Sequence, residues 1–128
     1  MAVFEFKKST YTMEIAGNKF EVDPLVCDRY RAKFAQISKK LLDDIVKSAY
    51  SDESVQAYLS EAVKTIDNIL GDGATARIYS GRVIDYLSIC DILAFIAREN
   101  EAFYTRYSSE YPKPMNREQK RYQEYKKK

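Results

Sequence analysis

The fold is decided near the start of the chain by residues 11–24, which read YTMEIAGNKFEVDP. Apolar and polar side chains alternate in Tyr11–Ile15 and again in residues 19–22, the pattern typical of half-buried strands. The intervening Ala16-Gly17-Asn18 favours a tight turn centred on Gly17-Asn18, because glycine and asparagine both tolerate positive φ. The stretch therefore predicts a β-hairpin.

A helix begins where this stretch ends. Asp23 can cap backbone N–H groups, and Pro24 suits the first helical position because its missing N–H would have no intrahelical partner. Apolar residues then follow at spacings of three and four, which predicts a helix ending near Tyr50. That apolar stripe consists of Tyr30, Phe34, Ile37, Leu41 and Ile45.

Two further long helices and one short helix are predicted downstream. A start signal at residues 51–54 and an apolar face ending at Leu70 predict the second long helix. Ala74–Tyr79 has room for one or two turns, closed by Gly81. The third long helix runs from about Arg82 to Ser108. Its middle is apolar on most faces, as expected of a helix central to the core or buried in an oligomer.

Upstream of the hairpin, Phe4 and Phe6 alternate with Glu5 and Lys7, which predicts an additional strand. A lone hairpin is only marginally stable. The small sheet must therefore lean on the helices or pair with another chain.

These elements predict an α+β fold that is mainly α, with an N-terminal hairpin, three long helices and a basic tail. The expected single domain covers residues 1–109, divided into a hairpin region (1–22) and a helical body (23–109). Pro112 and Pro114 break the helical pattern, and residues 110–128 are expected to be a flexible basic tail.

Three glycines are interpreted as structural turns: Gly71, Gly73 and Gly81. Gly71 is well placed to end a helix with positive φ. A phosphate-binding loop is not favoured, because these glycines follow a helix and no Gly-Lys-Ser/Thr sequence accompanies them.

The composition points away from catalysis. The chain contains no histidine, so serine–histidine and cysteine–histidine nucleophile pairs are excluded, and Cys27 and Cys90 alone make a zinc site untenable. We expect a protein that is not an enzyme and has no cofactor. Neither a secretory signal nor a membrane-spanning stretch is apparent, so a cytoplasmic protein is expected.

Charge and tyrosine content indicate where partners could bind. Residues 112–128 carry a net charge of +5 against −3 for the rest of the chain. This basic segment is interpreted as a solubilising tail, a contact for nucleic acid, or a peptide that orders on meeting a partner. Tyrosine is common in protein interfaces. The candidate partner-binding residues are Tyr104, Tyr107, Tyr111, Arg117, Lys120 and Arg121.

One block has a family resemblance. Residues 65–79, TIDNILGDGATARIY, resemble the Ile-Asp-x-Ile-Leu-Gly-x-Gly block of tail assembly chaperone-like proteins from siphoviruses and prophages of Gram-positive bacteria. The order of elements over about residues 4–105 is also similar. Ile66, Ile69, Leu70, Gly71 and Gly73 match the block.

The resemblance implies a non-enzymatic helper that binds the tape measure protein before the tail tube polymerises, often self-associates and is absent from the finished particle. Two alternatives stay open. One is a nucleic-acid-binding accessory protein that acts through the basic tail, and the other is a structural tail or connector component.

Overall fold

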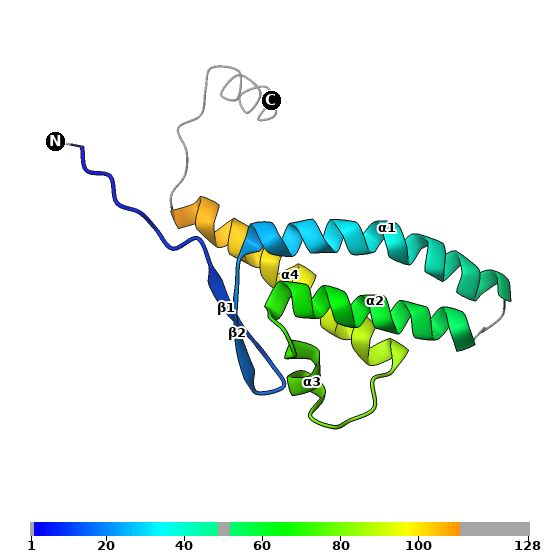
Figure 1. Cartoon of the computed structure of the whole chain (residues 1–128). Coiled ribbons are helices and arrows are strands. Elements are labelled where there is room, and N and C mark those ends of the chain that lie inside the picture. Colours follow the sequence, from blue (N-terminus) through cyan, green and yellow to red (C-terminus); the bar gives the residue numbers. More distant parts are fainter. Residues whose placement is uncertain (1, 49–51, 111–128) are drawn as a thin grey trace, which may run out of the picture.

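The computed structural model describes residues 2–48 and 52–110 (Figure 1). In chain order they form strands β1 (Tyr11–Ile15) and β2 (Asn18–Val22) and helices α1 (Pro24–Ser48), α2 (Asp52–Leu70), α3 (Ala74–Tyr79) and α4 (Tyr86–Glu110). The predicted fold class, a mainly α chain with an N-terminal antiparallel hairpin followed by three long helices, is confirmed. Of the predicted basic tail, residues 110–128, Glu110 is the last residue of α4 and residues 111–128 lie outside the described part of the chain.

The hairpin packs one face on the helices. β1 and β2 are antiparallel, with Tyr11 opposite Val22 and Ile15 opposite Asn18. Alternate side chains are buried, as the two-residue period requires. The buried face consists of Tyr11, Met13, Ile15, Phe20 and Val22.

The turn of the hairpin lies one residue earlier than predicted. Its two central residues are Ala16 and Gly17, with φ of 51° and 80°, and Asn18 already belongs to β2. Asn18 instead supports the turn through its side chain, whose amide donates to the carbonyl oxygens of Ala16 and Arg77 at 3.3 Å each. The predicted centre at Gly17-Asn18 is therefore wrong, because the pairing of Ile15 with Asn18 leaves Ala16 and Gly17 as the two turn residues.

The predicted strand around Phe4 and Phe6 is also wrong. Residues 2–10, all within the described part of the chain, form neither helix nor strand. The alternating pattern is present, but the hairpin of this chain does not pair with it. A strand needs a neighbour to satisfy its backbone N–H and C=O groups.

The long helices build the body (Figure 1). α1 and α2 run antiparallel and pack along their length. α4 lies across them, and its contact with α1 is less extensive than its contact with α2. α1 begins as predicted, since the Leu25 N–H donates to the Asp23 carboxylate at 3.0 Å. α2 supplies much of the core, and its buried side chains are Tyr58, Leu59, Ala62, Thr65, Ile66, Ile69 and Leu70.

α4 begins at Tyr86, four residues later than predicted. Asp85 is the cap: its carboxylate accepts from the Ser88 N–H at 2.7 Å, and its carbonyl accepts from the Ile89 N–H at 3.1 Å. Val83, which looked like part of the helix, is 88% exposed in the preceding loop. The apolar middle of α4 was expected to be central to the core or buried in an oligomer. Within this chain Ile89, Ile96 and Asn100 are buried, and the other described side chains of α4 are half-buried or exposed.

Candidate protein-binding groove

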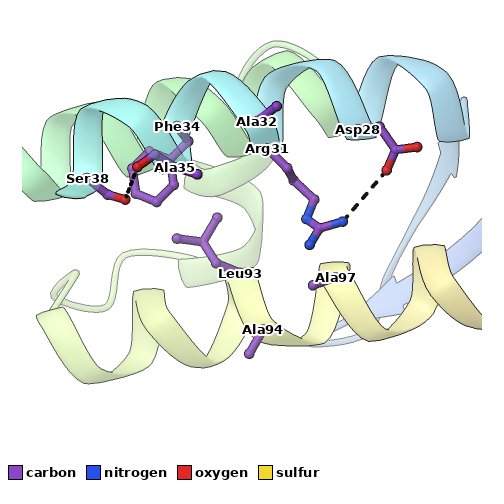
Figure 2. A pocket seen from close by; sticks show the side chains of 9 residues that line it. All are labelled: Asp28, Arg31, Ala32, Phe34, Ala35, Ser38, Leu93, Ala94 and Ala97. Carbon is purple, nitrogen blue, oxygen red and sulfur yellow. Dashed lines mark hydrogen bonds and ion pairs between the residues drawn. The ribbon is translucent and has the colours of Figure 1, made fainter.

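A groove of about 500 Å³ opens between α1 and α4 (Figure 2). We call it the α1–α4 groove. Both walls are mostly apolar, with charged side chains near one end. Its lining consists of Asp28, Arg31, Ala32, Phe34, Ala35 and Ser38 from α1, and of Leu93, Ala94 and Ala97 from α4.

The groove exists because α1 directs its apolar stripe towards α2. Phe34 packs edge-on against Tyr58 of α2, with ring centroids 5.5 Å apart. The side of α1 that faces α4 instead carries Ala35, and Ala32 borders the groove from the side turned away from α4 (Figure 2); both alanines are exposed. An alanine methyl is too short to reach across to α4, so the two helices leave the space between them open (Figure 2).

One end of the groove is polar. An Arg31 guanidinium nitrogen lies 3.7 Å from an Asp28 oxygen, and both side chains are partly exposed. Asp28 also accepts from the Asn100 amide at 2.9 Å and from the Tyr104 hydroxyl at 2.8 Å. Burial, together with the hydrogen bond to Asp28, raises the pKa of Tyr104 to about 12. The tyrosine therefore remains a proton donor to this carboxylate at neutral pH.

Behind Asp28, a buried hydrogen-bond network fixes the two helices. Asn100, only 1% exposed, accepts from the Tyr11 hydroxyl at 2.7 Å and donates to the Pro24 carbonyl at 3.4 Å. Burial also raises the pKa of Tyr11. Because these contacts join β1, the start of α1 and α4, they hold this end of the groove in one geometry.

The candidate partner-binding residues do not gather in the groove. Tyr104 borders it through Asp28, whereas Tyr107 accepts a hydrogen bond from Lys7 on its carbonyl oxygen at 3.1 Å. Four of the predicted residues lie outside the described part of the chain: Tyr111, Arg117, Lys120 and Arg121.

Asp28, Arg31 and the groove-lining alanines were missed by the sequence analysis. A signal was present in the two pairs Ala32/Ala35 and Ala94/Ala97, since small residues three apart on two helices leave room beside each backbone.

The block from 65 to 79 forms the end of α2, the connection at 71–73 and α3. Gly71 and Gly73 in the connection have φ of 118° and 77°, and Gly81 after α3 has φ of 83°. Asp67 of α2 accepts from the Thr75 N–H at 2.9 Å and from the Thr75 hydroxyl at 2.8 Å, so that its carboxylate caps α3 from outside. The residues that carry the resemblance thus set the α2–α3 corner, away from the α1–α4 groove.

Across residues 2–48 and 52–110, no helix is long and apolar enough to cross a membrane. Within the same residues, no three side chains of Asp, Glu, Cys or His cluster closely enough to hold a metal ion.

Comparison with known protein families identifies a family for this chain. The model of a family of unknown function, DUF6673, matches residues 16–124. No curated protein and no solved structure matches the chain. Because the matched residues make up most of its length, this chain belongs to the DUF6673 family.

Proposed function

We propose that this chain is a non-enzymatic helper of phage or prophage tail assembly, which holds a helical segment of the tape measure protein in the α1–α4 groove. It would act in the cytoplasm of the bacterial host. The observation that carries the proposal is the groove itself, a mostly apolar cleft left open between two 25-residue helices.

The lining suits a helix better than a small polar ligand. Helix-in-groove recognition places the apolar face of an amphipathic helix in a hydrophobic cleft. Ala32, Ala35 and Ala94 at the edges of the groove would let a third backbone come close, because small contact side chains favour the short end of the interaxial range of about 8–10 Å. Phe34 and Leu93 supply the larger apolar surfaces.

The charged end would orient the client. A guanidinium has five N–H donors, more than the single ion pair of Arg31 with Asp28 uses. A carboxylate on the client helix next to its apolar face could bind there. We therefore expect a client segment with apolar residues three and four apart and an acidic residue towards one end.

The assignment to tail assembly rests on the resemblance of residues 65–79 and on the order of elements, and the DUF6673 match attaches no activity to it. The tape measure protein is the expected client because it is long and rich in helix, and its apolar surface needs cover before the tube forms.

The test compares two substitutions of one kind. Ala94→Arg places a long cation in the groove, and Ala57→Arg places the same side chain at an exposed position of α2 that does not line it. Each full chain is co-expressed with the tape measure protein of the same genome, and co-purification is measured. The proposal predicts that the wild type and Ala57→Arg retain the client and Ala94→Arg loses it. Retention by Ala94→Arg equal to that of Ala57→Arg, or no retention by any form, would contradict it.

A second candidate function is favoured by the basic segment. Residues 112–128 carry seven basic side chains, and the family match extends through residue 124. A nucleic-acid-binding accessory protein would bind with a strong dependence on salt, and deletion of residues 112–128 would abolish the binding. Binding that survives the deletion would rule this candidate out.

A further inference from the structure

An extended arm precedes the hairpin and presents apolar side chains to solvent. We call residues 2–8 the N-terminal arm. Val3, Phe4 and Phe6 are 72%, 79% and 93% exposed. The two phenylalanine rings meet edge to face at 5.0 Å, so they form one apolar unit. Monomeric proteins seldom leave such a unit uncovered.

The base of the arm is fixed to the body at the C-terminal end of α4. The Lys7 ammonium lies 3.2 Å from the centroid of the Tyr107 ring and donates to the Tyr107 carbonyl at 3.1 Å. Lys8 lies 3.8 Å from Glu21 of β2. From this base the arm runs away from the helices (Figure 1).

We infer that the arm of one copy fills the α1–α4 groove of a second copy, and that the exchange is reciprocal. The inference rests on the same groove as the proposed function and adds a second occupant, a segment of the chain itself. The molecule has an uncovered apolar groove and an uncovered apolar arm, and a two-fold dimer with both arms exchanged covers all four surfaces.

The arm falls short of the apolar part of its own groove. Only the polar end lies near the anchor, since Asp28 bonds Tyr104, one turn of α4 before Tyr107. Ala97, the nearest lining residue on α4, precedes Tyr107 by ten residues, or about 15 Å along the helix. Phe4 is three residues from the anchored Lys7, or about 10 Å in extended chain, and Phe6 is adjacent to it. Both rings therefore reach Leu93 and Ala97 only on another copy.

The arms supply most of the surface that the exchange would bury. A buried phenylalanine covers roughly 150–250 Å², so two rings and a valine hide roughly 400 Å² on each arm. The two arms together hide roughly 800 Å², and the narrow groove adds less, which places the interface at the small end of the range for specific protein pairs.

Charge complements this fit. In an extended arm, Glu5 points opposite to the Phe4 and Phe6 rings. With those rings on the groove floor, the Glu5 carboxylate lies at the rim, where Arg31 of the other copy offers N–H donors. The exchange therefore keeps the groove covered until a client helix displaces the arm.

The first test is the mass in solution by light scattering over a range of concentrations, on full-length chains. Wild type and Ala57→Arg are expected to dimerise. Phe4→Ser/Phe6→Ser and Ala94→Arg change exposed side chains, so both should keep the wild-type circular dichroism spectrum. The dimer dissociation constant of each should rise by roughly 100-fold or more. A monomeric wild type, or dimers unaffected by both variants, would overturn the inference.

The second test locates the arm. A photo-reactive phenylalanine at position 6 is irradiated in an equal mixture of ¹⁴N- and ¹⁵N-labelled full-length protein. We expect mixed-isotope cross-links to the peptide that spans residues 93–97. Cross-links within one copy, or to another surface, would overturn the exchange.

These tests separate the two ideas. If only the proposed function is wrong, the dimer behaves as described and no variant retains the client. If only the exchange is wrong, Ala94→Arg loses the client while the mass of Phe4→Ser/Phe6→Ser equals that of the wild type.

Discussion

Ala16 shows how one residue departs from what its type prefers. Its φ of 51° is in the left-handed region, where a β-carbon meets the following carbonyl oxygen. The two-residue turn needs positive φ at both central positions, and Gly17 satisfies the second without strain. The sequence suggested asparagine for this role because asparagine also tolerates that region. Strand register, which pairs Ile15 with Asn18, instead places the alanine there.

Ala16→Gly is expected to stabilise the protein by about 0.5–1 kcal/mol, because glycine adopts this backbone conformation without a steric penalty. The matched control is Ala57→Gly, which puts the same change in an exposed helical position and should destabilise by about 1 kcal/mol. Urea denaturation measures both. A destabilised Ala16→Gly would show that the alanine is not strained.

Cys27 links burial to a pH dependence. Burial raises the pKa of this fully buried thiol from the usual value of 9.0 to about 11. The folded chain keeps this proton where the unfolded chain has lost it. The resulting stabilisation is complete below pH 9 and is lost as the pH rises through 11.

We therefore expect the free energy of unfolding to fall between pH 9 and pH 11 by on the order of 2 kcal/mol more in the wild type than in Cys27→Ala. Buried tyrosines add the same slope to both proteins, so they cancel in the difference. Denaturation series at pH 8, 9, 10 and 11 measure it. A constant gap between the two proteins would contradict the expectation.

Elements were predicted better than their ends. Helices α1 and α2 were predicted from apolar residues three and four apart, and α1 also from the Asp23-Pro24 start. Their observed bounds agree closely with the predicted ones. The start of α4 did not follow, because Val83 and Ile84 extend the apolar pattern into a loop. The cap signal at Asp85, with a serine three residues on, was the better guide.

The corner between α2 and α3 depends on Asp67. Asp67→Ala removes the carboxylate that accepts both hydrogen bonds from Thr75, whose side chain is buried. The loss should lower the free energy of unfolding by about 2–3 kcal/mol. Asp72→Ala, at an exposed position in the same connection, should change stability by less than about 0.5 kcal/mol. Urea midpoints of the two variants compare them. Equal losses would mean that Asp67 does not hold the corner.

At the scale of the whole molecule, the groove could not be predicted from periodicity. It depends on the angle at which α4 crosses the α1–α2 pair, and three helices with the same apolar stripes could also pack closed. The alanine pairs were visible in the sequence, but nothing local shows that they border one gap between two helices. Tyr104 and Tyr107 were predicted to bind a partner, whereas in the structure both make hydrogen bonds within the chain.

The central claim is that a client helix lies in the α1–α4 groove. The most direct measurement places a photo-reactive side chain at position 94 of the full-length chain, co-expresses it with the tape measure protein and maps the cross-links. A matched chain carries the same group at position 57. The account predicts cross-links from position 94 to one amphipathic segment of the tape measure protein, and few from position 57. Equal cross-linking from both positions, or none from position 94, would contradict it.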